Sequence, residues 1–236
     1  MNFDALAAYL NQTPLLWIII TISVYKISII IYEKFGKNPL LQPLIVACVI
    51  ILLILFFAKV PFEEYFKSVN ILNFFLGPAT VALAVLLYRN LRLIKSFLMP
   101  ILVTLIVGGI FTTSLAVGIL WLLGGSEVTM LSMTTKSVTA PITVVIANDI
   151  GSNASLAIGF VAITGVLGAS FCGFLFKILK IKHDESKGFA LGLVAHAVGV
   201  SKAYEISEKA AAFGAVAMSL MGIFIAILLP IIIHHI

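Results

Sequence analysis

Long apolar stretches constrain this chain most strongly; residues 97–123, 154–179 and 210–233 each contain 20 or more consecutive residues without a charged side chain. A helix needs about 20 apolar residues to cross a bilayer, whereas a strand of a membrane barrel needs about 10. Only a helix of that length satisfies its own backbone hydrogen bonds within lipid. The stretches therefore predict an all-α, polytopic membrane protein.

The composition leaves little room for a soluble domain. Of the 236 residues, 61% are hydrophobic and 11% are charged, whereas soluble domains are about half apolar and a quarter charged. We therefore expect one transmembrane domain over residues 1–236. The net charge of +5 is modest and its basic residues lie in short loops, which indicates membrane orientation and no nucleic-acid partner. No phosphate-loop, dinucleotide or metal-ligand motif occurs, so we expect no enzyme, cofactor or metal site.

The chain divides into seven or eight membrane segments arranged as two repeat-like halves, about 14–123 and 130–233. The third segment of each half is interrupted, at Gly77-Pro78 and at His196–Gly199. Proline removes a backbone hydrogen bond and clashes with the preceding turn. Interrupted segments at matching positions point to a transporter binding site. The expected segments cover residues 14–31, 41–60, 71–88, 97–123, 124–150, 154–179, 188–205 and 210–233.

Positive charge predicts how the halves are oriented. The loops near residues 32–38, 89–96 and 177–187 are rich in lysine and arginine, so all three should be cytoplasmic. That arrangement requires the segment at 124–150 to re-enter the membrane without crossing it. The halves then form an inverted repeat with two broken helices, and the N-terminus lies outside.

The expected re-entrant segment contains the first candidate site. Lys136 lies in a run of hydroxyl side chains that includes Ser137 and Thr139, and Pro141 follows. An interrupted helix end presents free N–H groups and a positive dipole, which suit an anion. The alternative is an amphipathic surface helix with Lys136 among the lipid headgroups.

The second candidate site follows residue 188. His196, Gly199, Ser201, Lys202 and Glu205 succeed one another in an otherwise apolar segment. Ionisable groups at bilayer depth are costly, and histidine titrates near physiological pH, so His196 is a candidate for substrate binding and proton transfer. The alternatives are a structural histidine between helices and a solvated helix end with ion pairs.

Residues near the start of the segment at 154–179 admit two interpretations. Asp149 could take part in proton coupling with His196 and Glu205, or Asn148, Asp149 and Asn153 could cap the following helix. The motif GVLGASFCG within that segment supplies small residues for close helix packing.

Three runs resemble the LrgB/CidB family, in particular its YohK-like branch: GPATVALAVLLY, KSVTAPITVVIANDIGS and KGFALGLVAHAVGVSKAYE. The resemblance extends over nearly the whole chain and implies a multi-pass protein of the bacterial inner membrane. Bacterial members are described as antiholin-like or holin-associated proteins that influence murein hydrolases beside a small LrgA/CidA-type membrane partner. A plant relative is a plastid glycolate/glycerate carrier, and bacterial members have been linked to pyruvate uptake.

Two functions are therefore expected. The first is a proton-coupled carrier of small organic anions such as pyruvate, glycolate or lactate. The second is an antiholin-like regulator of murein hydrolase activity and lysis. Beyond the lipid bilayer, the partners expected are the anion, the small membrane partner and further copies of the chain. The predicted substrate-binding residues are His196, Lys136, Ser137, Thr139, Gly77, Pro78, Gly199, Ser201 and Lys202.

Overall fold

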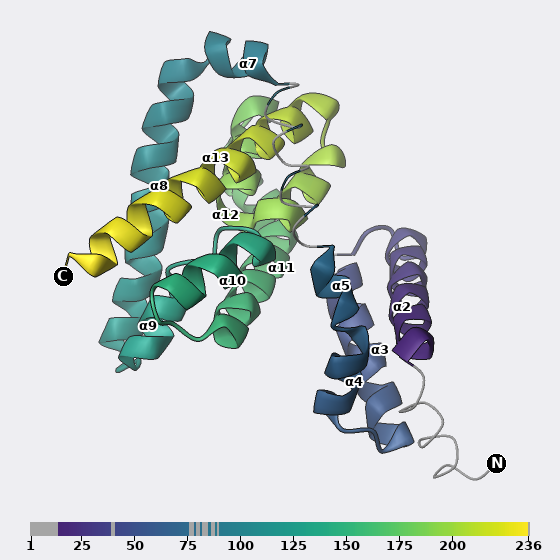
Figure 1. The fold of residues 1–236 in the computed structure, drawn as a ribbon. Coiled ribbons are helices and arrows are strands. Elements are labelled where there is room, and N and C mark those ends of the chain that lie inside the picture. The colour runs from purple at the N-terminus through teal and green to yellow at the C-terminus, as the bar shows by residue number, and fades with distance from the viewer. Residues whose placement is uncertain are drawn as a thin grey trace. The chain divides into compact units, whose positions relative to one another are not determined.

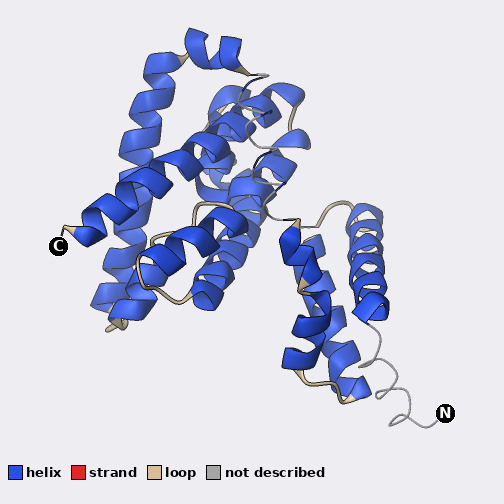
Figure 2. Ribbon diagram, viewed as in Figure 1, coloured by secondary structure: helices blue, strands red, loops and turns tan. Residues whose placement is uncertain are grey.

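The computed structural model describes residues 14–38, 41–75, 78, 81, 85, 88 and 90–235. All regular structure in these residues is helical, as the apolar stretches predicted (Figures 1 and 2). The chain forms two compact units, Met1–Ala79 and Thr80–Ile236.

The first unit contains α2 (Pro14–Lys34), α3 (Pro43–Ala58), α4 (Phe62–Val69) and α5 (Ile71–Phe74). Its core forms where Trp17 of α2 meets Tyr65 of α4, with ring centroids 5.3 Å apart and the planes nearly perpendicular. The hydroxyl groups of Thr21 and Tyr65 share a hydrogen bond of 2.9 Å. Of the interruption expected in this half, Pro78 is exposed, and Gly77 lies outside the described residues.

The second unit contains the remaining elements: α7 (Leu91–Ser96), α8 (Leu98–Leu122), α9 (Glu127–Met133), α10 (Ala140–Asp149), α11 (Ala154–Ile178), α12 (Asp184–Tyr204) and α13 (Glu208–His234). Asn153 caps α11 by accepting a hydrogen bond from the Leu156 N–H at 2.9 Å, as the capping interpretation predicted. Ser207 caps α13 in the same way through the Ala210 N–H at 3.1 Å.

Among the described residues, four helices are long and apolar enough to cross a membrane: α2, α8, α11 and α13. A helix of 25 residues, such as α8 or α11, is about 37 Å long, which exceeds the hydrocarbon thickness of about 30 Å. By contrast, the 10 residues of α10 reach only about 15 Å. The predicted helical membrane architecture is therefore present, while the count of seven or eight segments and the inverted repeat stay predictions.

The two basic loops of the second unit lie at the same end of it, which we call the basic end. The rings of Phe97, where α7 meets α8, and Phe213 of α13 lie 5.2 Å apart. Phe97 also lines a common cavity with His183 and Glu185, which lie at the start of α12. From this end α8 leads away, and α11 returns to it (Figure 1). The segment between them, α9 and α10, stays at the opposite end.

Helix α12 is a hairpin that begins and ends at the basic end. It is broken at His196, where φ is 43° and ψ is −132°. Beyond the break the chain turns back, so that a Cβ atom on Gly199 would collide with the Leu191 carbonyl oxygen. The base of the hairpin is held by a 2.9 Å hydrogen bond from the Ser207 hydroxyl to Asp184 and by an ion pair between Glu185 and Lys209. The segment at 188–205 thus contains the expected break, and the break reverses the chain.

Helices α9 and α10 form a second hairpin at the opposite end. Its base is held to the start of α11, because the Ser132 hydroxyl accepts from the Asn153 N–H at 3.2 Å. The connecting residues 134–139 are all buried, and the Thr143 hydroxyl donates to the Thr135 carbonyl at 3.3 Å. Neither α9 nor α10 is long enough to span a bilayer.

Candidate functional site

Helix α13 is the common support of the two hairpins. On its first half, Gly188 of α12 lies against the Ala210 carbonyl and Gly192 lies against the Gly214 carbonyl, so closely that neither glycine has room for a Cβ atom. The two helices therefore run side by side in the same direction. If the pairing of Gly188 with Ala210 and of Gly192 with Gly214 continues for one more turn, His196 lies level with Met218 and Ser219 of α13.

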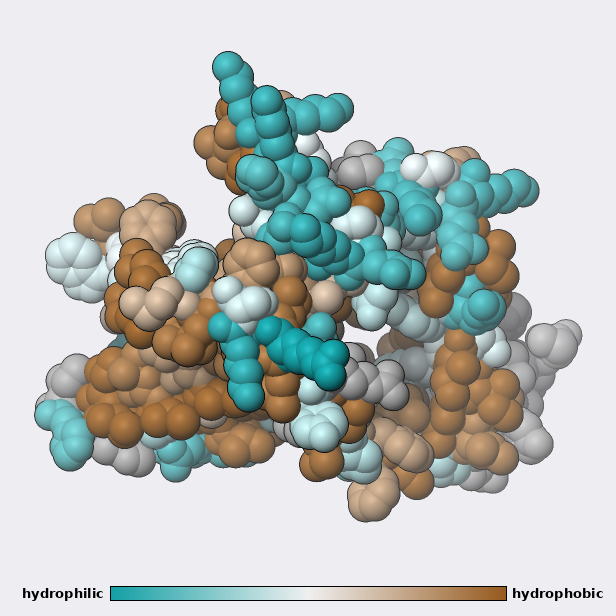
Figure 3. Space-filling model, turned by 90° about the horizontal axis from the view of Figure 1, so that it is seen from above, coloured by the Kyte–Doolittle hydropathy of each residue, from teal (hydrophilic) through white to brown (hydrophobic). Residues whose placement is uncertain are grey.

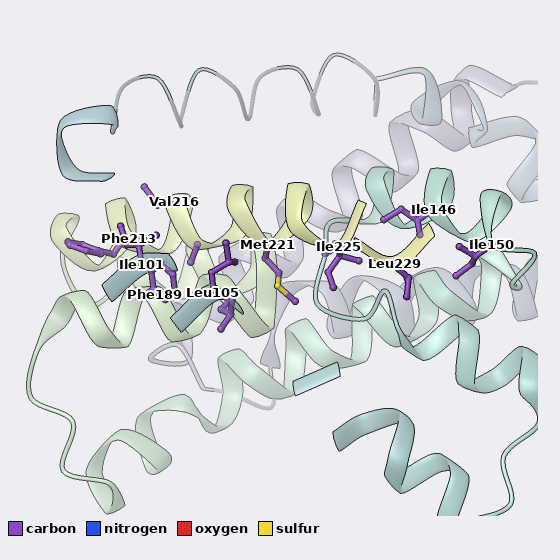
Figure 4. Packing of buried hydrophobic residues seen from close by; sticks show 13 residues of the cluster. Ile101, Leu105, Ile146, Ile150, Phe189, Phe213, Val216, Met221, Ile225 and Leu229 are labelled. Carbon is purple, nitrogen blue, oxygen red and sulfur yellow. The ribbon is translucent and has the colours of Figure 1, made fainter. Parts of the chain in front are cut away.

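The second half of α13 supports α10. A Cβ atom on Gly222 would lie 2.8 Å from the Ile142 side chain, in the first turn of α10. Farther along, Ile146 and Ile150 share a buried cluster with Ile225 and Leu229 (Figure 4). The tips of both hairpins therefore approach the middle of α13, which is a candidate span of 26 residues.

His196 forms the tip of the α12 hairpin and is 4% exposed. Its Nε2 donates to the Val161 carbonyl of α11 at 2.9 Å. The ring lies over Gly165, where an added Cβ atom would be 2.7 Å from the His196 Cε1 atom. This glycine belongs to the small-residue motif GVLGASFCG, which provides the close packing predicted for it. With Nε2 donating, Nδ1 is the imidazole atom left for another partner.

Lys136 forms the tip of the α9–α10 hairpin and is 8% exposed. Its ammonium donates to the Ser137 hydroxyl at 3.0 Å. The three ion pairs found in the described part of the chain all involve other lysines. Both hairpin tips lie against the middle of α13, so Lys136 and His196 are at similar levels along that helix. A buried ammonium without a carboxylate costs several kcal/mol, so the position favours an anion.

Two buried hydroxyl groups lie at the same level. The Oγ1 atom of Thr139 and the Oγ atom of Ser219 have no hydrogen-bond partner among the described residues, although both side chains are more than nine-tenths buried. Thr139 is the N-cap of α10 but makes no capping hydrogen bond, so its hydroxyl remains available at the positive end of the helix dipole. Lys136, Ser137, Thr139 and Ser219 together could hold a small anion through one charge and several hydroxyl groups.

Of the other predicted site residues in this unit, Lys202, Glu205 and Asp149 lie away from the two tips. Gly199 permits the close return of the α12 hairpin, and Ser201 is exposed. Lys202 pairs with Glu205 at 2.6 Å at the base of that hairpin. Asp149 is exposed at the last residue of α10, at the opposite end of that helix from Thr139.

Sequence reasoning missed Ser219 and the Val161 carbonyl. Ser219 is a single hydroxyl within an apolar stretch, and that isolation is the signal that could have identified it. Nothing in the sequence marks the Val161 carbonyl, because its role depends on the crossing of α11 and α12.

Comparison with known proteins places the chain in a family. The chain is 28% identical over 218 residues to a protein of Staphylococcus epidermidis named "Holin-like protein CidB", covering 92% of this chain and 95% of the relative. It is also 28% identical over 220 residues to proteins of Bacillus mycoides and Bacillus cereus named "Antiholin-like protein LrgB", covering 93% of this chain and 96% of each relative. No solved structure matches the chain. The sequence model of the LrgB-like family matches residues 21–235, so this chain belongs to the LrgB-like family.

Proposed function

We propose that this chain is an antiholin-like membrane protein that acts in lysis control beside a small membrane partner. The support is the names of relatives that share nearly their full length with this chain, "Holin-like protein CidB" and "Antiholin-like protein LrgB". The four helices long enough to span a bilayer agree with a membrane location. In this proposal the two hairpins are re-entrant, inserted from opposite sides of the bacterial inner membrane.

Co-expression in a bacterial host tests this proposal. The chain is produced with and without a small holin-like membrane protein, and murein hydrolase activity is followed together with the decline in culture turbidity. We expect the chain to change the onset of lysis and to co-purify with the partner. Unchanged lysis together with no co-purification would contradict the proposal.

A second function, the carriage of small organic anions, is supported by one specific observation. Lys136 is buried beside hydroxyl groups and has no carboxylate partner among the described residues. A lysis regulator has no need of such a group, whereas a monocarboxylate would neutralise its charge. In this proposal His196 lies beside the bound anion and the coupling ion is a proton.

Uptake by proteoliposomes tests the carrier. Radiolabelled pyruvate, glycolate and lactate are supplied under an inward proton gradient. We expect flux in the wild type, a loss of at least tenfold in Lys136→Met, and partial retention in Lys136→Arg. Lys95→Met is the matched control, because Lys95 is exposed in the last turn of α7. Flux that is absent from the wild type, or equal in all four proteins, would contradict the carrier.

A further inference from the structure

A cluster of lysines surrounds a hollow at the basic end of the second unit. The hollow has a volume of about 490 Å³, within the range of about 300–1,000 Å³ typical of small-molecule sites. It lies where α11 ends and the α12 hairpin begins and ends. Five lysines line it: Lys177, Lys180, Lys182, Lys187 and Lys202.

Two of these lysines are neutralised and three are not. Lys187 pairs with Asp184 at 3.0 Å, and Lys202 pairs with Glu205. Lys177, Lys180 and Lys182 form no ion pair with any residue that the structure describes. No acidic side chain lines the hollow itself. It therefore carries a net positive charge that can accept an anionic group.

The rest of the wall is apolar. Phe176, Ile181 and Ile206 line the hollow beside the lysines. Phe176 belongs to the last turns of α11, a candidate span that ends at Ile178. Charge and apolar surface thus meet at the end of a candidate membrane-spanning helix. Figure 3, seen from the side where α7 lies in Figure 1, shows hydrophilic side chains gathered beside hydrophobic surface.

The backbone conformation at Lys180 allows the charge of this lysine to be removed without destabilising the fold. Lys180 follows the C-terminus of α11 with φ of 51°, in the left-handed region that favours glycine. Lys59 occupies the same kind of position after α3, with φ of 54°, in the first unit. A cation after a helix C-terminus is favourable in both cases because of the helix dipole. What distinguishes Lys180 is that other lysines converge on it around an apolar hollow.

We propose that this hollow binds an anionic phospholipid. The phosphate lies among Lys177, Lys180 and Lys182, and the start of an acyl chain lies on Phe176 and Ile181. A soluble phosphate would use only the charge, whereas a phospholipid carries the charged and the apolar part next to each other. Basic pockets between membrane helices recognise lipid headgroups in this way. The proposal is independent of whether the protein controls lysis or carries anions.

Native mass spectrometry of the full chain, delipidated in a nonionic detergent, tests the proposal. Dioleoyl phosphatidylglycerol and dioleoyl phosphatidylcholine are added at equal concentrations, and sn-glycerol 1-phosphate serves as the soluble competitor. The variants are Lys180→Gly, the triple variant Lys177→Gln, Lys180→Gly and Lys182→Gln, and the matched control Lys59→Gly. The temperature of unfolding is measured for each.

We expect the wild type to retain phosphatidylglycerol at least tenfold better than phosphatidylcholine. Each substitution of Lys177, Lys180 or Lys182 should weaken the preference for phosphatidylglycerol by about fivefold. Lys180→Gly should do so without lowering the temperature of unfolding, because glycine suits its backbone, and Lys59→Gly should bind as the wild type does. Equal retention of both lipids, or a triple variant that still prefers phosphatidylglycerol, would overturn the proposal. Displacement of the lipid by glycerol phosphate would overturn it in favour of a soluble phosphate site.

Discussion

The tips of the two hairpins of the second unit each contain an ionisable side chain that is buried to a similar extent but lies in different surroundings. His196 is 4% exposed and Lys136 is 8% exposed, yet the histidine has a hydrogen-bonded carbonyl and a fitted glycine beneath its ring. The lysine has one neighbouring hydroxyl. Burial by itself therefore does not identify a binding group. The unsatisfied hydrogen-bonding capacity of Lys136 makes it the stronger ligand candidate, while His196 fixes the hairpin against α11.

The hairpins also differ in how they contact α13. Gly192 of the α12 hairpin touches the α13 backbone at Gly214, which cannot move away without distorting the helix. Gly222 of α13 meets only the end of the Ile142 side chain of α10, which can change rotamer. The α12 hairpin thus packs directly on the α13 backbone, whereas at Gly222 α10 meets α13 through a side chain that can adjust.

The largest expected effect on stability comes from substitutions at the glycines where each hairpin contacts α13. Gly192→Ala would force a Cβ atom into the Gly214 carbonyl, so we expect the free energy of unfolding to fall by more than about 3 kcal/mol. Gly222→Ala should cost less than about 1 kcal/mol, because a side-chain terminus can yield. Unfolding by dodecyl sulfate in mixed micelles measures both.

Gly173→Ala on α11 is the control for this pair. Apart from the neighbouring backbone of α11 itself, no atom lies within 4 Å of the position of its added Cβ, so the helix should gain up to about 1 kcal/mol from the better propensity of alanine. Equal losses for Gly192→Ala and Gly222→Ala would show that the two hairpins are docked alike.

An intermediate effect on the free energy of unfolding should distinguish the tip at His196 from the tip at Lys136. His196→Ala removes a satisfied hydrogen bond and leaves a cavity over Gly165, so the free energy of unfolding should fall by about 2 kcal/mol. Lys136→Met removes a buried cation that lacks a carboxylate, so stability should be unchanged or should rise by about 1 kcal/mol. The same mixed-micelle unfolding decides the sign. A loss at Lys136 as large as the loss at His196 would mean that the lysine is structural.

The smallest effect concerns the bases of the hairpins. Hydrogen bonds from Lys187 and Ser207 hold the pKa of Asp184 below its ordinary value. The stabilisation is therefore present above about pH 4 and is lost as the pH falls through the lowered pKa of the folded protein. Asp184→Asn should flatten the decline of the unfolding temperature between about pH 5 and pH 3.

The α9–α10 hairpin provides the control, because its base depends on Ser132 and the Asn153 backbone, neither of which titrates. Ser132→Ala should shift the unfolding temperature equally at every pH and leave the acid decline intact. If the unfolding temperature of Asp184→Asn still declines in acid as that of the wild type does, other carboxylates cause the decline.

The sequence determined the physical class of this protein and much of its local structure. Apolar stretches longer than 20 residues require helices in lipid, and the cap at Asn153 follows from its position before the stretch at 154–179. The break in the segment after residue 188 was equally visible, because a histidine and a glycine interrupt an apolar pattern. These features depend on residues within a few positions of one another.

Only the tertiary structure decided that the break at His196 reverses the chain, which moves Lys202 and Glu205 to the base of the hairpin. It also decided that the tips of both hairpins, which contain Lys136 and His196, lie against the middle of α13. Both outcomes depend on backbone contacts between segments far apart in sequence, such as Gly192 against Gly214. A glycine in a sequence permits such a contact, but the partner that fills the space is chosen by the packing of the whole unit.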